Sequence, residues 1–250
     1  MNEENLLVSS VISVFNAEKY LEESLKSLTN QDFERHEIVV INDGSTDATL
    51  SIIYDCLHSF PYYQVISRKN NSGMTKSWNE GIKKAKGRYI SRHDGDDIAL
   101  SNKISMGFKY MEENPEVFCV GSSALFIDGH GNSLDKIYPD DFFLSHDYRN
   151  ILKSTILGVN CPILHPTVMF RKNVFLEMGG YDERYRIAAD LDLWYRCIKE
   201  KKILCNIKKV LLKYRIHSQQ YSKREEMEYE VRMMRKERFN KKNEIIKKNK

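Results

Sequence analysis

The sequence lacks the features of a secreted or membrane-spanning protein. Its five cysteines, at positions 56, 119, 161, 197 and 205, show no CxxC spacing, and an odd number does not suit a disulfide framework. No apolar run approaches the roughly 18 residues needed to span a bilayer. The first residues have neither the basic start nor the apolar core of a signal peptide. We therefore expect a cytoplasmic protein in a reducing compartment.

Two common phosphate-binding motifs are also missing. There is no GxGxxG after the first apolar run, and GxxxxGK[ST] occurs nowhere in the chain. These motifs bind phosphates in dinucleotide-dependent dehydrogenases and in P-loop enzymes. Both classes are therefore disfavoured, and a phosphate-containing ligand would need another binding scheme.

What the chain does have is the composition of an ordinary globular domain. It is 41% hydrophobic and 30% charged over 250 residues, which is enough for one sizeable core. The net charge of +4 is unevenly distributed, because residues 222–250 hold eleven Lys or Arg against six Asp or Glu. This tail carries +5 and leaves −1 for the rest. We expect one domain over residues 1–220 and a basic helical tail over 221–250.

Apolar runs alternate with helical patterns in the first part of the chain. Runs at 6–14, 37–41, 63–67 and 88–93 have the pattern of strands, and an amphipathic helical pattern follows each of the first three. This alternation predicts an α/β fold with a mostly parallel central sheet flanked by helices. Asn16 is expected to cap the first helix. The later predicted elements are helices at 101–114, 174–178 and from 190, and strands at 117–127 and 164–170, with 132–160 less regular.

Polar side chains follow all four of the early strands. Ligands of a parallel sheet bind outside the carboxyl ends of its strands. Four successive strand ends with polar residues therefore suggest one shared pocket. These residues are Asn16 and Glu18 after the first strand, Asp43 after the second, 70–76 after the third and Asp94 to Asp97 after the fourth.

The fourth strand end, Asp94-Gly95-Asp96-Asp97, places three carboxylates within four residues. Acids this close raise the pKa of at least one of them unless a cation or several donors compensate. A hard divalent metal bound through oxygen does so. A calcium loop is disfavoured, because Ala99 and Ser105 stand where its glycine and glutamate are required. An isolated DGDD is more often a solvated turn, and the neighbouring strand ends are what favour a metal site.

In their order and spacing, these stretches resemble family 2 glycosyltransferases of the GT-A fold over most of residues 6–221. No single stretch is decisive, but the series is specific. The resemblance implies a Rossmann-like sheet with a nucleotide-sugar half at 1–115 and an acceptor and catalytic-base half at 116–220. The stretches are 13–21, 40–47, 70–81, 89–90, 94–97, 165–171, 179–183, 190–194 and 214–217.

The resemblance implies an inverting enzyme that moves a sugar from a nucleotide diphosphate sugar, typically a UDP-sugar, to a hydroxyl of a glycan or lipid-linked glycan. Asp43 matches the position that accepts a hydrogen bond from the base. Asp94 matches the first acid of the family's Asp-x-Asp motif, near the ribose, and Asp97 is expected to orient either the donor sugar or a water molecule. Asp96 matches the acid that binds Mn²⁺ or Mg²⁺, a Lewis acid for the leaving diphosphate. His217 matches a position that approaches the metal or diphosphate.

Asp190 matches the general base that removes the proton of the acceptor hydroxyl. A carboxylate at the amino end of a helix is stabilised in its ionised form by the helix dipole. The resemblance also places Phe15, Asn16 and Glu18 among the nucleotide-sugar contacts, although helix capping explains the last two as well. His165 is a candidate for the acceptor site, with a plain strand-edge histidine as the alternative.

Two positions depart from the family pattern. Trp78 stands where many relatives have Arg, and Lys76 is the residue that we expect to supply the missing charge to the diphosphate. Ala189 replaces the Glu of the family's Glu-Asp motif. This second change removes a carboxylate that would support Asp190.

The tail carries Met227, Val231 and Met234 at helical spacing before its Lys-rich end. Such a segment is either a solvated helix or a peripheral contact with the inner face of the cell membrane, at about 1 kcal/mol per basic residue. Nucleic acid is not an expected partner, because no reading helix or aromatic interleaving accompanies the charge.

The family analogy suggests a role in bacterial-style surface polysaccharide assembly, such as lipopolysaccharide, capsule or glycolipid. Two other functions remain open. One is a non-catalytic nucleotide-sugar-binding scaffold, for which the acids would be dispensable. The other is a sugar-phosphate nucleotidylyltransferase, which would need a Gly-rich basic loop after the first strand.

Overall fold

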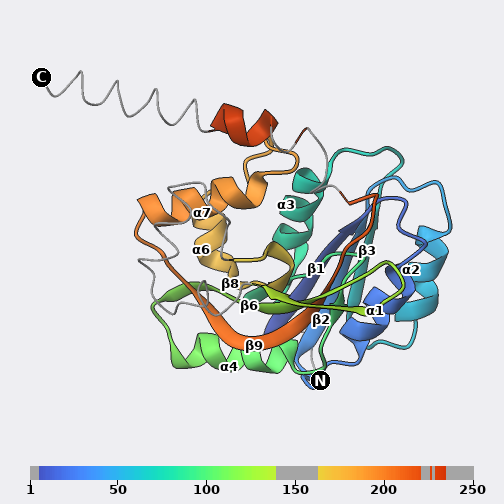
Figure 1. Ribbon diagram of the computed structural model, residues 1–250, viewed down its shortest axis with the longest axis horizontal. Helices are drawn as coiled ribbons and strands as arrows, with labels where there is room; N and C mark the ends of the chain where they lie inside the picture. Colours follow the sequence, from blue (N-terminus) through green and yellow to red (C-terminus); the bar gives the residue numbers. More distant parts are fainter. Residues whose placement is uncertain (1–5, 139–162, 221–225, 227–228, 235–250) are drawn as a thin grey trace, which may run out of the picture.

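The first half of the chain alternates strands and helices, as expected. The computed structural model describes residues 6–138, 163–220, 226 and 229–234, and one curved sheet runs through its centre (Figure 1). Its first strands pair in the order β3-β2-β1-β4, and every pair is parallel. The parallel part that the sequence predicted is therefore confirmed. Its elements are β1 (Val8–Val14), α1 (Leu21–Thr29), β2 (His36–Asn42), α2 (Thr49–Leu57), β3 (Tyr63–Ser67), α3 (Met74–Lys84) and β4 (Tyr89–Arg92).

The second half adds strands of both directions to the same sheet. β8 is antiparallel to β4 and to β6, and β9 runs parallel to β6. The order continues β4-β8-β6-β9-β5, and β7 pairs with β6. The sheet therefore runs through both predicted halves. These elements are β5 (Ile98–Ala99), α4 (Lys103–Glu113), β6 (Val117–Ile127), β7 (Ser133–Tyr138), the 3₁₀ turn η2 (His165–Thr167), β8 (Met169–Arg171), α6 (Lys172–Glu177), α7 (Ala189–Lys199) and β9 (Ile203–Arg215).

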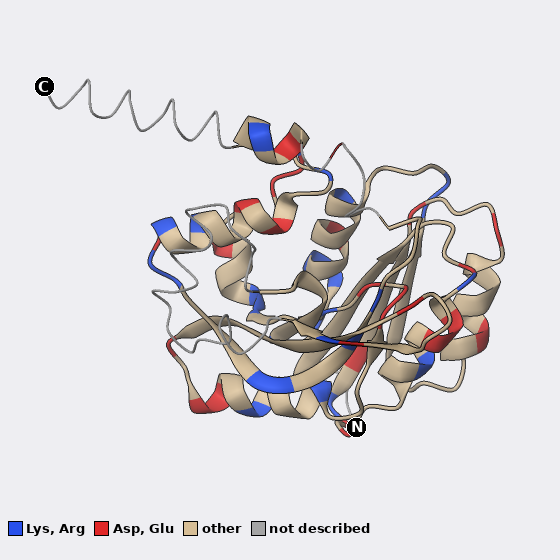
Figure 2. Cartoon of the chain, in the orientation of Figure 1, with Lys and Arg blue, Asp and Glu red and all other residues tan. Residues whose placement is uncertain are grey.

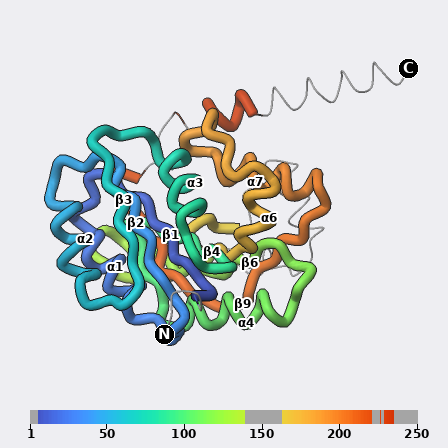
Figure 3. The backbone as a smooth tube through the Cα atoms, turned by 180° about the vertical axis from the view of Figure 1, so that it is seen from behind, coloured from blue at the N-terminus to red at the C-terminus, as the bar shows by residue number. Residues whose placement is uncertain are grey.

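Different helices cover the two faces of the parallel strands (Figures 1 and 3). In β2, Ile38 and Val40 share a core cluster with α1 and α2. The alternate residues Val39 and Ile41 share another with α3, α6 and α7. Every residue of β2 is buried, which explains why its central residues 38–41 form a continuous apolar run rather than an alternating pattern.

Strand β9 is long and strongly bent (Figure 1). Its pairing with β6 shifts register in the middle, where Ser122 pairs with Ile207 but Ser123 pairs with Val210. Lys208 and Lys209 are the extra residues, and both are exposed; Figure 2 shows basic residues at this bend. Extra residues in one strand bend it and increase its twist. The bend returns the chain from the far side of the sheet to the acidic cluster.

Some elements differ from the sequence-based expectation. Asn16 does not cap α1, because the helix begins only at Leu21 and the Asn16 side chain accepts a hydrogen bond from the backbone N–H of Thr46 instead. The stretch 164–170 is not one strand, since Pro166 cannot donate to a ladder and lies in η2 before β8. The strands β5, β7 and β9 were not predicted. Residues 139–162 lie outside the described part.

The predicted basic tail falls mostly outside the described residues. Residues 226 and 229–234 are helical, and Met234 is 2% exposed in the core cluster that also contains α7. Where the chain is described, no helix combines the length and apolarity that a membrane crossing requires.

Candidate active site

The loops that follow β1 and β2 are bonded to each other. The Asn16 N–H donates to Ser45 Oγ at 2.9 Å, and Thr46 N–H returns a bond to Asn16 Oδ1 at 2.9 Å. Glu18 Oε2 accepts a bond of 2.9 Å from Ala48 N–H. Asn16 holds a positive φ of 48°, and Phe15 beside it is 39% exposed. The predicted contacts Phe15, Asn16 and Glu18 therefore form one edge of the site.

Asp43 lies at the end of β2 with its carboxylate almost fully buried. Arg68 donates to Asp43 Oδ1 at 2.9 Å, and the backbone N–H groups of Ser72 and Gly73 donate at 3.0 and 2.8 Å. Burial raises the pKa of Asp43, but the bonds from Ser72, Arg68 and Gly73 outweigh it, so the pKa lies below its usual value. Asp43 is therefore an ionised anchor that holds the loop after β3 against the loop after β2.

The three acids of the cluster point in different directions. Asp94 and Asp96 have side chains that are 31% and 28% exposed, whereas Asp97 is 1% exposed. Asp97 Oδ1 accepts the backbone N–H of Arg215 at 2.9 Å. Burial, together with Asp96 and Asp94, raises the pKa of Asp97 well above its usual value. The predicted contact of Asp97 with the donor sugar is thus not what the structure shows, because this side chain anchors the end of β9.

His217 bonds directly to the cluster. Its Nε2 lies 2.9 Å from Asp96 Oδ2, and Gln219 N–H donates to its Nδ1 at 3.3 Å. This pattern assigns the proton to Nε2, so His217 donates to Asp96. Tyr20 packs against the His217 ring at 4.9 Å between centroids. The predicted proximity of His217 and Asp96 is seen, and in this structure His217 Nε2 orients the Asp96 carboxylate.

The cluster suits a cation that shares its ligands with a nucleotide. Among the described residues, no group of three or more His, Cys, Asp or Glu forms a complete metal cage. Asp94 and Asp96, which are separated only by Gly95, nevertheless present partly exposed carboxylates. Mg²⁺-type ions are commonly bound by one or two carboxylates plus substrate phosphates and water. The residues present therefore fit such an ion when a diphosphate supplies the remaining oxygens.

A buried arginine connects the cluster to the second half of the domain. Arg92 has no exposed surface, yet its Nη2 donates to Asp94 Oδ1 at 2.8 Å and its Nη1 donates to the Val11 carbonyl at 2.7 Å. Its guanidinium lies 4.1 Å from the centre of the Trp78 ring. Trp78, which departs from the family pattern, thus stacks on a cation that pairs with Asp94. Lys76 is exposed on the first turn of α3.

His165 lies inside this network. It is 8% exposed, and its Nε2 receives bonds from Tyr181 Oη at 2.6 Å and Arg92 Nε at 3.4 Å. Burial and the nearby Arg92 hold the pKa of His165 well below its usual value, so the ring is neutral. The predicted acceptor contact is therefore not seen, because both neighbours direct His165 into the core.

Asp190 occupies the second position of α7 and is partly buried. Its Oδ1 accepts the N–H of Leu191 at 2.8 Å. Burial raises the pKa of Asp190 to about 6; the charge of Asp94 adds to this, while the Leu191 N–H and Arg92 oppose it. The charge of Asp94 thus acts on Asp190, although the two residues lie nearly a hundred positions apart in the sequence. A carboxylate with a pKa near 6 is ionised at neutral pH and is a stronger base than an ordinary aspartate.

Sequence reasoning missed the buried cations of this site. Lys103, 2% exposed, donates to the carbonyls of Arg92 and Pro166 at 2.6 and 2.7 Å, and burial lowers its pKa to about 7. Arg215 donates through Nε to the Asp96 carbonyl at 2.8 Å and through Nη2 to Glu23. The available signal was a charged residue within an apolar strand, as Arg92 is within β4.

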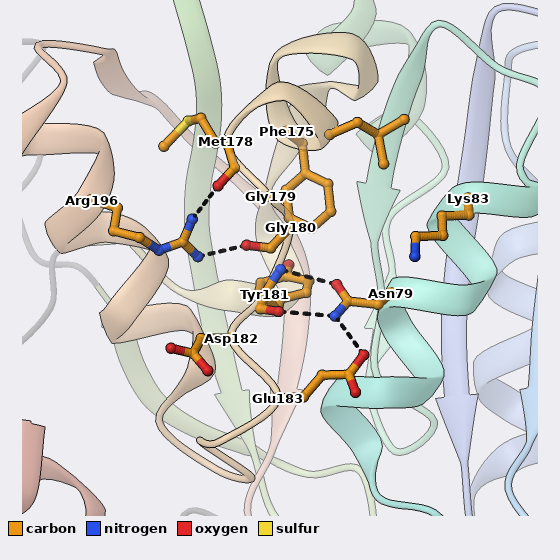
Figure 4. A pocket seen from close by; sticks show the side chains of 11 residues that line it. Asn79, Lys83, Phe175, Met178, Gly179, Gly180, Tyr181, Asp182, Glu183 and Arg196 are labelled. Atoms are coloured by element: carbon orange, nitrogen blue, oxygen red, sulfur yellow. Dashed lines mark hydrogen bonds between the residues drawn. The ribbon is translucent and has the colours of Figure 1, made fainter.

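A pocket of about 610 Å³ opens on another side of the domain (Figure 4). It lies between α3, α6 and α7. There Asn79 bonds both backbone groups of Tyr181, and Arg196 bonds the carbonyls of Met178 and Gly180. None of the predicted site residues lines it. Its polar groups therefore fix the turn at 178–181, and the acidic cluster is the better candidate for chemistry.

The mixed sheet, with polar residues at the carboxyl ends of its parallel strands, is consistent with the GT-A fold of glycosyltransferases. The chain belongs to glycosyl transferase family 2, whose pattern matches residues 9–179. An uncharacterized glycosyltransferase of Haemophilus influenzae is 33% identical over 219 residues, which are 86% of this chain and 67% of the relative. The amylovoran biosynthesis glycosyltransferase AmsE of Erwinia amylovora is 28% identical over 225 residues, which are 89% of this chain and 81% of AmsE.

Solved structures share the fold at lower identity. S. aureus TarS 1–349 in complex with UDP-GlcNAc superposes with a TM-score of 0.73 at 21% identity, over 88% of this chain and 61% of that one. The mannosyltransferase PcManGT from Pyrobaculum calidifontis, in complex with GDP-Man and Mn²⁺, gives 0.64 at 17% identity, over 86% and 58%. This chain thus spans about three fifths of the solved chains.

Proposed function

We propose that the protein transfers a sugar, with inversion, from a nucleotide diphosphate sugar to a hydroxyl of a glycan or lipid-linked glycan. The observation that carries the proposal is Asp190, a carboxylate with a pKa of about 6 at the amino end of α7, electrostatically coupled to Asp94. In this reaction Asp190 takes the proton of the acceptor hydroxyl while the oxygen of that hydroxyl bonds to the anomeric carbon of the donor sugar. The bond from that carbon to the diphosphate breaks on the opposite face. One displacement inverts the configuration.

The donor that we propose is a UDP-sugar. In support, TarS is described with UDP-GlcNAc, and the loops after β1, β2 and β3 meet around the ionised Asp43. Asp43 and the loop that it organises, 70–73, would read the base. PcManGT is described with GDP-Man, so a guanine nucleotide is the comparison that a binding test must include.

Asp94 and Asp96 would hold Mn²⁺ or Mg²⁺ together with the diphosphate, with His217 orienting Asp96. The ion would supply Lewis acidity that neutralises charge on the departing nucleoside diphosphate. Lys76, exposed at the start of α3, would add positive charge on the same side. The name of AmsE supports a role in polysaccharide assembly, and a cytoplasmic enzyme would meet such donors. A membrane contact of the tail would fall on 235–250, outside the described residues.

The donor and metal assignments are tested by thermal shift with UDP, GDP, Mn²⁺ and chelator. At UDP concentrations 100-fold above Kd we expect stabilisation of about 5–10 °C that requires the metal. Asp96→Ala should abolish this metal dependence. Equal stabilisation by UDP in the presence of chelator would contradict the metal assignment, and a larger shift with GDP would contradict the donor.

Asp190→Asn tests the base. The amide keeps the shape of the side chain but cannot take a proton, so transfer should fall by about 10²–10⁴-fold while UDP-induced stabilisation stays the same. A non-catalytic binding protein would keep its biological activity with this substitution. Full transfer by the variant would remove Asp190 from its proposed role.

A further inference from the structure

The start of α7 lacks a cap of its own. Its N-cap residue is Ala188, followed by Ala189, and neither has a polar side chain to cap the helix; within its first turn Asp190 Oδ1 accepts only the N–H of Leu191. Unpaired N–H groups at a helix start are satisfied by side-chain acceptors, water or ligands. Asp190, the proposed base, is the next residue, so whatever holds this helix start also holds the base.

The missing acceptor comes from the tail. Glu230 Oε1 accepts the N–H of Arg186, and Glu230 Oε2 accepts the N–H groups of Ile187 and Ala188, all at 2.9 Å. One carboxylate thus binds three successive backbone donors in the segment that leads into the eleven-residue helix α7, close to the positive end of its dipole. Figure 1 shows the short helix that contains Glu230 beside the start of α7. Position 189 holds Ala instead of the family's Glu, and the carboxylate next to the start of α7 is that of Glu230, about forty residues later in the chain.

Two further contacts make this arrangement specific. On the other side of the same loop, Thr75 Oγ1 donates to the carbonyls of Tyr185 and Arg186 at 2.7 and 3.3 Å. In the tail helix, Met234 is 2% exposed and belongs to the core cluster of Ala188. The loop before Asp190 is therefore held between α3, which begins beside the loop bound to Asp43, and a packed tail helix.

We propose that Glu230 is a positioning residue for Asp190, so that the helical residues 229–234 complete the catalytic site rather than merely extending the domain. Glu230 fixes the backbone of 186–188 and thereby the direction from which the Asp190 carboxylate meets the acceptor hydroxyl. It touches no substrate. The proposal rests on the function proposed above, because it requires Asp190 to act as the base.

The test uses the full chain with Glu230→Gln, and Glu226→Gln as a matched control on an exposed residue of the same segment. Gln keeps the size of the side chain but replaces one acceptor oxygen with a donor that faces an N–H group. We expect kcat to fall about tenfold, since small misplacements of a catalytic group cost up to about 100-fold, with the donor KM unchanged. Hydrogen exchange of the peptide spanning 185–191 should become faster. Glu226→Gln should change neither quantity.

Glu230→Asp provides a second variant in case the amide disturbs folding. It keeps the charge on a shorter side chain, and we expect a smaller fall in kcat than with Gln. Faster exchange with an unchanged kcat would reduce Glu230 to a purely structural cap and overturn the proposal, as would an equal loss in Glu226→Gln. If Asp190→Asn is fully active, the proposed function itself fails, whereas the exchange measurement still reports whether Glu230 holds the loop.

Discussion

Asp190 combines two environments that pull its protonation in opposite directions. Burial and the nearby Asp94 favour the neutral acid, while the Leu191 N–H favours the carboxylate, and the result is a pKa of about 6. Because the pKa of Asp190 is higher in the folded than in the unfolded protein, the free energy of unfolding decreases as pH rises from about 3.8 to about 6. Below this range Asp190 costs no stability, and above it the loss is complete. The stability lost is at most about 3 kcal/mol. In return, the Asp190 carboxylate is more basic than an ordinary aspartate, as the proposed removal of the acceptor hydroxyl proton requires.

The first prediction concerns the pH dependence of transfer. The base must be ionised, so kcat/KM should fall as pH decreases through about 6, approaching a tenfold loss per unit below it. The measurement is a pH profile of initial rates at saturating metal. Asp192→Asn is the control, because Asp192 pairs with Arg196 at 2.7 Å on the same helix and should leave the midpoint unchanged. A profile that is flat between pH 5 and 7 would contradict the assignment.

The acids of the site could be found from the sequence because each follows a strand or begins a helix. Asp43, Asp96 and Asp190 were proposed from chain position and family resemblance, and their roles stay predictions. Arg92 and Glu230 were not, since their roles depend on partners brought near only by the tertiary fold. Sequence position also failed to show that Asp97 and His165 point inward, because the orientation of a side chain depends on its neighbours.

At the scale of elements, the loops after β2 and β3 meet at a glycine. Gly44 has a φ of +79°, and a Cβ built there would lie 2.6 Å from the carbonyl carbon of Asn70. A side chain at this position would therefore be strained by its own backbone and would also push against the neighbouring loop. That loop carries Ser72 and Gly73, which donate to Asp43.

The second prediction is that Gly44→Ala destabilises the protein by about 2 kcal/mol or more and weakens UDP binding. Both effects have one cause, the displacement of residues 70–73 from Asp43. Gly179→Ala is the matched control, because Gly179 has a similar φ of +84° with no atom near its missing Cβ. Its cost should be only about 1–2 kcal/mol, with UDP binding retained. Chemical unfolding and UDP titration measure the two quantities.

Elements with local signals were predictable, and elements that depend on distant partners were not. The parallel strands β1 to β4 have buried apolar runs with a helix between each pair. In contrast, the apolar pattern of β9 is interrupted by Lys208 and Lys209, which form its bulge and face solvent. β5 has two residues, too few for any periodicity.

At the scale of the molecule, the sheet ties the proposed donor and acceptor halves together. β4 pairs with β8, and β5 pairs with the end of β9, so neither half has a complete sheet alone. Buried Arg92 adds a bond to His165 across the same junction. The two halves proposed from the sequence, 1–115 and 116–220, should therefore behave as the single domain expected over 1–220.

The third prediction follows from this continuity. Calorimetric unfolding should show one transition, with calorimetric and van't Hoff enthalpies in agreement. UDP with Mn²⁺ should raise the temperature of the whole transition, because a ligand stabilises every part of a cooperative unit. Two transitions, with only one shifted by UDP, would show that the halves unfold independently.

The bend of β9 brings residues from late in the sequence to the acidic cluster, and this affects the order in which the site can form during synthesis. Arg215 and His217, which bond Asp97 and Asp96, lie about 120 residues further along the chain. At a synthesis rate of about 5–20 residues per second, Arg215 and His217 are synthesised roughly 6–24 s after Asp96 and Asp97. During that interval the nascent sheet carries an acidic cluster without its anchors. Any chain released before His217 would have the sheet edge for donor binding but not the oriented carboxylates.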